Sequence, residues 1–346
     1  MPAAVTARAA CRVDCAGGTL DIWPLGLLHS GARTVAFAID VEARVRLSPR
    51  AAGYRVVQNG QAVEAADALA LSRHADGALA GLVLAALGAP PAEVELESGS
   101  PRGGGLGASS AMAVALIAAA ESFAGRPAST PAARTALARD LEAVLMGLPT
   151  GTQDHWAAVL GGALEVEHRP GGGEVRRLET DLDALGDSLV VVYTGATHFS
   201  AANNWQVIRR RLDGDSDIVR LFDGIAEAAG EASAALAAGD LPRLGAVMSR
   251  EWSLRRRLAP EVSTPGIEAL LAAAAAAGAW GGKACGAGGG GCLALLSPPA
   301  RREAVAAALT AAGGRVLATR PTAEPLRVAV EEGDLGAVQG AAAGSA

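Results

Sequence analysis

The sequence is poor in the residues that mark several classes of protein. Aromatic residues make up only 3% of the 346 residues. The chain has four cysteines: Cys11, Cys15, Cys285 and Cys292. Neither pair has the C-x2-C spacing typical of zinc and redox motifs, and each lies in an apolar or glycine-rich run. We expect buried, reduced thiols, with a zinc site or disulfides as the alternatives.

The chain also lacks a strongly basic segment, a secretory signal and a long apolar run. Its net charge is −6, so we expect no nucleic-acid partner. Two arginine triplets, at 209–211 and 255–257, stand in helical context, and we interpret them as solvated helix faces. Apolar stretches such as 270–277 are far shorter than the roughly 20 residues that span a bilayer. We therefore expect a cytoplasmic protein with no membrane partner.

The length of the chain exceeds what one hydrophobic core usually organises, so we expect two domains. A break at Asp187–Ser188 precedes an apolar run, Ser188–Tyr193, that is typical of a buried strand. This break places the domains at 1–187 and 188–346.

Apolar periodicity and capping residues predict several helices. Three of them span residues 67–87, 131–145 and 266–277. Ser129 or Thr130 is expected to cap the second helix, and Thr264 the third. Side-chain oxygens at these positions accept hydrogen bonds from the first free N–H groups of a helix.

The stretch Pro101–Met112, PRGGGLGASSAM, is the most informative part of the sequence. It follows a strand-like run at 94–97 and precedes an apolar run without glycine or proline. The pattern predicts a strand, a glycine-rich loop and a helix, an arrangement whose backbone N–H groups bind phosphate. It is not a Walker A motif, and no acidic residue follows at the distance of a dinucleotide fingerprint. A purely structural turn is the alternative.

Three residues outside this loop strengthen the phosphate interpretation. Phosphoryl transfer needs a phosphate cradle, a metal ligand and a group that orients or deprotonates the attacking hydroxyl. Glu142 and Ser109 or Ser110 can bind the metal, and Asp154 can orient or deprotonate the attacking hydroxyl. Arg12 can offset the negative charge of Asp154 or of the phosphates. Two of them have an ordinary alternative: Glu142 can be a solvated helical glutamate, and Asp154 can be a helix-capping aspartate.

Three motifs make the sequence similar to the GHMP kinase superfamily, which includes galactokinase, homoserine kinase, mevalonate kinase and phosphomevalonate kinase. They are ACRVDCAGG at 10–18, PRGGGLGASSA at 101–111 and KACGAGGGG at 283–291, in the family's order. Two further strings, AGGTLD at 16–21 and GTQDHWAAVLGG at 151–162, resemble heptose-7-phosphate kinases and fucokinase-like sugar kinases most closely.

The resemblance implies a fold and an activity. The fold would be α/β with two domains, the first similar to domain 2 of ribosomal protein S5 and the second ferredoxin-like. The active site would lie in the cleft between them. The activity would be transfer of a phosphoryl group from ATP, with Mg²⁺, to a hydroxyl of a sugar or sugar phosphate.

The resemblance also assigns roles to residues. Asp154 would be the catalytic carboxylate that faces the acceptor hydroxyl, with Arg12 beside it. Ser109 and Glu142 would hold magnesium, and Ser110 is the alternative serine. The phosphates are expected on Pro101, Gly103, Gly104, Gly105, Leu106, Gly107, Ala108, Ser109 and Ser110. The acceptor is expected near Asp14, Gly18, Thr19, Asp21, His198, Asn204, Gly288 and Gly289.

The sequence departs from the family pattern in two places. Ala108 stands where the second motif usually has its first serine, which removes one hydroxyl near the expected metal site. Gly-Thr-Leu-Asp replaces the Glu-His-Thr-Asp of galactokinases, so galactose is a poor candidate acceptor. The alternatives are a mevalonate-type kinase or diphosphomevalonate decarboxylase, and a non-catalytic regulator that binds sugar or nucleotide. The oligomeric state stays open between monomer and homodimer.

Overall fold

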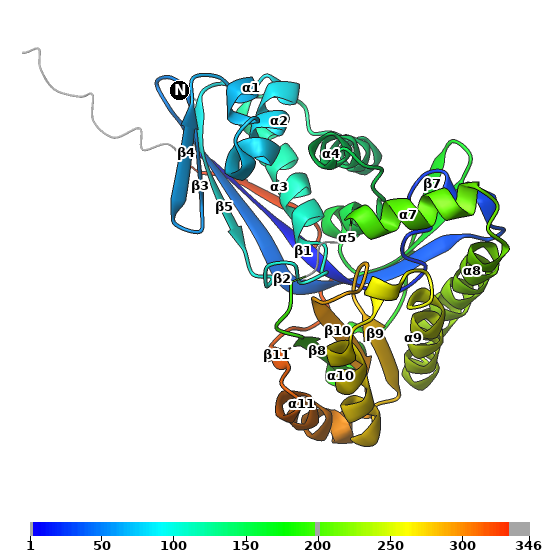
Figure 1. Ribbon diagram of the computed structural model, residues 1–346. Helices are drawn as coiled ribbons and strands as arrows, with labels where there is room; N and C mark the ends of the chain where they lie inside the picture. Colours follow the sequence, from blue (N-terminus) through cyan, green and yellow to red (C-terminus); the bar gives the residue numbers. More distant parts are fainter. Residues whose placement is uncertain (1–2, 198–200, 332–346) are drawn as a thin grey trace, which may run out of the picture.

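The protein is described by a computed structural model that covers residues 3–197 and 201–331. It contains an eight-stranded sheet and a four-stranded sheet, with helices packed around both (Figure 1). The α/β fold class predicted from the sequence is confirmed.

The first sheet is built around two long strands, β1 (Val5–Ala16) and β2 (Arg33–Pro49), which pair antiparallel. The strand order is β12-β1-β2-β5-β3-β4, and β6 joins β2 beside β5 and pairs with β7. The pairing of β3 with β5 is parallel, which makes the sheet mixed. The other strands are β3 (Tyr54–Gln58), β4 (Gln61–Ala65), β5 (Ala92–Ser98), β6 (Ala163–Arg169), β7 (Gly172–Leu178) and β12 (Arg327–Val330).

The second sheet has the order β11-β8-β10-β9, and its pairings are antiparallel. Its strands are β8 (Leu189–Tyr193), β9 (Gly281–Ala284), β10 (Cys292–Leu296) and β11 (Arg315–Leu317). Strand β8 is the buried strand predicted at 188–193. Although β12 follows this sheet in the chain, it returns to pair with β1. The proposed second segment, 188–346, therefore contributes one strand to the first sheet.

Helices in the first half of the chain pack on the first sheet and on one another. They are α1 (Ala68–Leu71), α2 (Ala78–Leu87), α3 (Ala108–Phe123), α4 (Pro131–Met146) and α5 (Gln153–Leu160). A further short helix, α6 (Leu182–Ser188), leads into β8. The single helix predicted over 67–87 is wrong. The chain breaks after Leu71, where the Ser72 hydroxyl donates to the Leu69 carbonyl and a short 3-10 turn, Ala75–Gly77, precedes α2. The caps are confirmed: Thr130 caps α4, and Thr264 caps α10 (Pro265–Ala276).

The remaining helices surround the second sheet or link it to the first (Figure 1). They are α7 (Ala201–Leu212), α8 (Ser216–Ala237), α9 (Leu241–Arg255), α10 (Pro265–Ala276) and α11 (Arg302–Ala311). Helices α8 and α9 pack against each other, and both contact β1, while α9 also contacts β9 and β10. Within the described residues, none of the helices has both the length and the hydropathy of a membrane span.

The second half of β1 is buried at every position, because helices and loops pack on both of its sides. This half contains Arg12 and Asp14, which are 2% and 0% exposed. The cysteines are buried and free, as predicted. Burial raises the pKa of Cys11 and of Cys15 to about 12, so these thiols stay protonated. Polar side chains on this strand must therefore find their partners inside the protein.

The cap of α4 gives a first test of the fold. The Thr130 hydroxyl accepts a hydrogen bond from the Ala133 N–H at 3.2 Å. We expect Thr130→Ala to lower the free energy of unfolding by about 1 kcal/mol, because this N–H loses its partner. Chemical denaturation measures the change. Ser129→Ala is the matched control, since the Ser129 hydroxyl makes no capping bond, and an equal loss in both variants would contradict the assignment.

Candidate active site

The glycine-rich loop, residues 101–107, connects β5 to the N-terminus of α3. Gly107 precedes the helix with φ 72°, and no described side chain caps the first turn. The N–H groups of residues 108–110 therefore have no partner within the helix. Gly105 also has a left-handed φ of 70°, and a Cβ there would lie 2.5 Å from the Cys285 carbonyl oxygen. The loop thus presents backbone donors at the positive end of a helix, an arrangement that is suited to binding anions.

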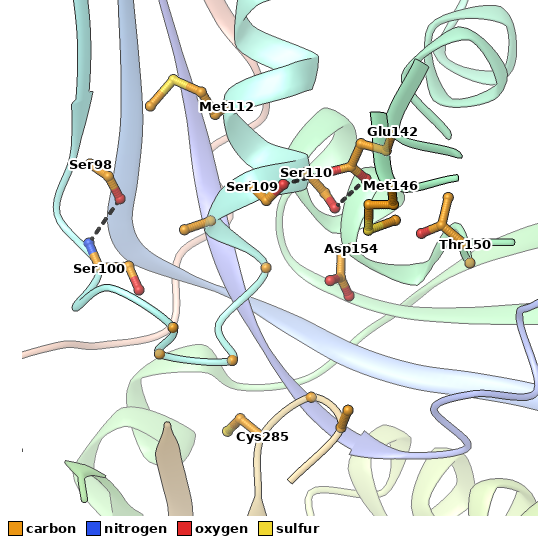
Figure 2. A pocket seen from close by; sticks show the side chains of 18 of the residues that line it. Ser98, Ser100, Ser109, Ser110, Met112, Glu142, Met146, Thr150, Asp154 and Cys285 are labelled. Atoms are coloured by element: carbon orange, nitrogen blue, oxygen red, sulfur yellow. Dashed lines mark hydrogen bonds between the residues drawn. The ribbon is translucent and has the colours of Figure 1, made fainter. Parts of the chain in front are cut away.

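A cavity of about 630 Å³ lies over this loop and extends to the 17–22 loop that follows β1. Figure 2 shows Ser98 and Ser100 on one side of the glycine-rich loop and Asp154 on the other, with Cys285 across from them. The residues predicted for the site that line the cavity are Arg12, Gly18, Thr19, Asp21, Pro101, Gly103, Gly104, Gly105, Gly107, Ala108, Ser109, Ser110, Glu142, Asp154 and Gly288. One space therefore joins the predicted phosphate, metal and acceptor groups.

Three predicted residues, Leu106, Asp14 and Gly289, do not line the cavity. The Leu106 side chain is buried in the core, and its carbonyl accepts from the Arg12 N–H at 2.9 Å. Asp14 is buried away from the cavity, and the Gly289 N–H donates to the Val262 carbonyl. His198 lies outside the described residues. Asn204 belongs to α7, and its side chain is not described.

Asp154 and Arg12 form the central ion pair of the site. Asp154 lies in the first turn of α5, and its Oδ1 accepts from Arg12 Nε at 2.8 Å and lies 2.7 Å from Nη2. Arg12 Nη1 also donates to the Gly105 carbonyl at 2.5 Å. The Asp154 side chain keeps 24% of its surface exposed, and Arg12 keeps 3%. Burial raises the pKa of the Asp154 carboxyl, although Arg12 acts in the opposite direction.

A second carboxylate, that of Glu142 on α4, accepts hydrogen bonds from Ser109 and Ser110 in the first turn of α3. Ser109 Oγ donates to Oε1 at 2.6 Å, and Ser110 Oγ donates to Oε2 at 2.9 Å (Figure 2). His155 Nε2 lies 2.7 Å from the same Oε2. Burial alone would raise the pKa of Glu142, but His155 and the two hydroxyls hold it below its usual value. An ionised carboxylate beside two hydroxyls is a set of oxygen ligands of the kind that Mg²⁺ prefers.

The 17–22 loop is tied to the start of α5. Asp21 Oδ2 accepts hydrogen bonds from the N–H groups of Thr152 at 2.7 Å and Gln153 at 3.0 Å. A Cβ on Gly151 would lie 1.8 Å from this oxygen, so only glycine fits there. Asp21 thus caps the helix that carries Asp154, although it is distant in sequence.

The second glycine run, residues 286–291, supports the first. The Gly104 carbonyl accepts from the Cys292 N–H at 2.8 Å. The Gly286 N–H donates to Asp14 Oδ1 at 2.8 Å, and Lys283 Nζ lies 2.7 Å from Asp14 Oδ2. Burial alone would raise the pKa of Asp14, but Lys283, Arg12 and Arg255 hold it below its usual value. Asp14 therefore acts as an ionised link between β1 and the second glycine run.

Sequence reasoning missed several residues of the site. Arg255 was interpreted as part of a solvated triplet, yet it is 2% exposed and lines the cavity. This interpretation was wrong because α9 turns Arg255 toward Glu251 and the 17–22 loop, while Arg256 and Arg257 stay exposed. The i,i+4 spacing of Glu251 and Arg255 was the only local signal. His155 carried no signal beyond its place in the GTQDHW string.

Comparison with known proteins identifies relatives of the chain. Residues 65–162 match the model of the N-terminal domain of GHMP kinases, and residues 232–315 match that of the GHMP kinase C-terminal region. Together the two models match more than half of the chain. No curated protein sequence matches it.

Several solved structures share the fold. A D-glycero-D-manno-heptose 1-phosphate kinase from Bacteroides thetaiotaomicron is 20% identical, with a TM-score of 0.73 over 94% of this chain and 98% of that one. The Methanococcus jannaschii mevalonate kinase is 17% identical, with a TM-score of 0.72 over 92% and 98%. The Lactococcus lactis galactokinase in complex with galactose is 16% identical, with a TM-score of 0.70 over 94% and 95%.

The close approach of Gly105 to the second glycine run is testable. Gly125→Ala places alanine at a similar left-handed φ of 63° with no atom within 4 Å of the new Cβ, so we expect it to cost about 1 kcal/mol of stability. Gly105→Ala should cost at least about 1 kcal/mol more, because its Cβ overlaps a backbone carbonyl. Denaturant titration of both variants checks this, and equal losses would mean that the two loops are not in contact.

Proposed function

The chain belongs to the GHMP kinase family, and we propose that it transfers the γ-phosphoryl group of ATP to a hydroxyl of a sugar or sugar phosphate. The observation that carries this proposal is the position of Asp154. Its partly exposed carboxylate, held by Arg12, lines one cavity together with the free N-terminus of α3 and the 17–22 loop.

The nucleotide half of the cavity fits a triphosphate. The loop offers unpaired N–H groups, and the helix dipole adds positive potential where negative charge would lie. The described residues hold no group of three His, Cys, Asp or Glu side chains suited to a metal. Ser109 and Glu142, with Ser110 as the alternative, would therefore hold Mg²⁺ together with phosphate oxygens and water. When bound, Mg²⁺ neutralises charge on the phosphate oxygens.

The acceptor half would bind and activate the hydroxyl. Asp154 accepts the proton of the attacking hydroxyl, and Arg12 keeps the carboxylate aimed into the cavity through two nitrogens. Thr19 and Asp21 add a hydroxyl and a carboxylate that suit hydrogen bonds to a polyol. Among the structural neighbours, the heptose 1-phosphate kinase and the galactokinase are named for sugars, which supports a sugar acceptor.

A mevalonate-type activity is the second candidate, because mevalonate kinases share the fold about as closely as the sugar kinases. An acceptor panel with ATP and Mg²⁺ separates the candidates. It contains heptose 7-phosphate, fucose, glucuronate and mevalonate, and it measures ADP and carbon dioxide. ADP release with a sugar supports the proposal. Turnover of mevalonate alone favours the second candidate. Tight ATP binding with no ADP formed in the presence of any acceptor favours a non-catalytic regulator.

The role of Asp154 predicts the behaviour of an isosteric variant. Asp154→Asn should lower kcat by about 10²–10⁴-fold, because a positioned base contributes that much. ATP affinity should change little, since the loop amides are intact. Asp140→Asn is the matched control: Asp140 is exposed on α4, and among the described residues it forms an ion pair only with Arg139. Wild-type turnover in Asp154→Asn would remove Asp154 from the mechanism.

The same carboxylate predicts an acid limb in the pH profile. Burial raises the pKa of Asp154, so the ionised form that accepts a proton is lost at a higher pH than for a free aspartate. We expect kcat to fall on acidification with a midpoint above about 4, the ordinary aspartate value. Steady-state kinetics with circular dichroism as a folding control measure this. A profile that stays flat to that pH in folded protein would contradict the assignment.

A further inference from the structure

We propose that Arg255, at the end of α9, is a positioning residue that holds the 17–22 loop in the conformation that receives the acceptor. The inference rests on the proposed function, because that function assigns this loop to the acceptor. Arg255 belongs to none of the family motifs found in the sequence, and its role follows from its contacts alone.

Arg255 holds two consecutive residues of the loop. Its Nη2 donates to the Gly18 carbonyl at 2.7 Å, and its Nη1 donates to Thr19 Oγ1 at 3.1 Å. Thr19 has a φ of 74°, which is rare for a β-branched residue. Such a conformation persists only where the surroundings hold it. The planar guanidinium supplies this restraint through two donors at once.

The guanidinium of Arg255 is itself held in place by Glu251. Glu251 Oε1 accepts from Arg255 Nε at 2.8 Å and from Nη2 at 2.5 Å. The other oxygen of Glu251 lies 3.2 Å from Lys283 Nζ, which in turn pairs with Asp14 on β1. The four side chains are at most 2% exposed. A buried guanidinium cannot leave its carboxylate without a large desolvation cost, so Arg255 is a rigid support.

The loop is thereby held at both ends. Arg255 holds Gly18 and Thr19, and Asp21 caps the start of α5. Turn bonds from the Leu20 N–H to the Gly17 carbonyl and from the Ile22 N–H to the Thr19 carbonyl connect them. None of the hydrogen bonds described for this loop reaches residues 101–107. Loss of Arg255 should therefore weaken acceptor binding and leave nucleotide binding nearly unchanged.

The test uses Arg255→Lys, which keeps a positive charge beside Glu251 but cannot reach Gly18 and Thr19 together. Thr19→Ala removes one of the two contacts between Arg255 and the loop, and it is the variant to test if Arg255→Lys does not fold. Arg256→Lys is the matched control, because Arg256 is an exposed neighbour that pairs with Glu268. The acceptor is the panel compound that wild-type protein turns over fastest.

We expect the KM for this acceptor to rise roughly tenfold or more in Arg255→Lys, the equivalent of one lost charge-assisted hydrogen bond. The KM for ATP should change less than about twofold, because the loop at residues 101–107 is not contacted by Arg255. Thr19→Ala also removes a hydroxyl proposed to contact the acceptor, so this variant is judged by hydrogen exchange and not by KM. An unchanged acceptor KM in a folded variant, or equal rises for acceptor and ATP, would overturn the proposal.

Hydrogen exchange provides a readout that needs no acceptor. It can therefore test the role of Arg255 even if the proposed kinase function is wrong. The amides of Leu20 and Ile22 should exchange faster in Arg255→Lys and Thr19→Ala than in wild type or Arg256→Lys. The amides of α9 should keep their wild-type rates, which separates loop positioning from general destabilisation. Wild-type exchange in the loop, or faster exchange throughout α9, would overturn the proposal.

Discussion

The site depends on a run of charges that alternate in sign from the cavity to the 17–22 loop, and all of them except the partly exposed Asp154 are buried. Its members are Asp154, Arg12, Asp14, Lys283, Glu251 and Arg255. Their consecutive contacts lie between 2.5 and 3.6 Å. Removal of a fully buried member such as Lys283 would leave its neighbours Asp14 and Glu251 each short of a partner, and breaking a buried pair typically costs about 3–5 kcal/mol. Because the members come from β1, α5, β9 and α9, this requirement fixes four elements and both sheets relative to one another.

The glycine-rich loop, residues 101–107, is the second part of the site and contacts these charges. Arg12 connects them, since the same guanidinium that holds Asp154 also donates to the Gly105 carbonyl. The loop lies so close to the second glycine run and to Arg12 that a side chain at Gly105 would overlap a carbonyl. Glycine at positions 103, 104, 105 and 107 keeps the backbone of this loop free of side chains where it lines the cavity. The loop that we propose for phosphate and the partly exposed carboxylate of Asp154 thus line one cavity, which is the arrangement that phosphoryl transfer requires.

The sequence predicted the parts of the structure that depend on local signals. The loop before α3, the caps Thr130 and Thr264 and the buried strand β8 each follow from residues within a few positions of one another. The break inside 67–87 was missed because apolar periodicity continues across it. Arg255 was missed because its burial depends on Glu251 and on a loop more than 230 positions away. The return of β12 to β1 is likewise a long-range pairing without a local pattern.

The most direct test of the account is a crystal structure of the protein with Mg²⁺ and a non-hydrolysable ATP analogue. The account predicts that the triphosphate lies on the N–H groups of residues 103–110, that the metal contacts Glu142, and that the terminal phosphate faces Asp154. A triphosphate bound away from the N-terminus of α3, or one whose terminal phosphate points away from Asp154, would contradict it.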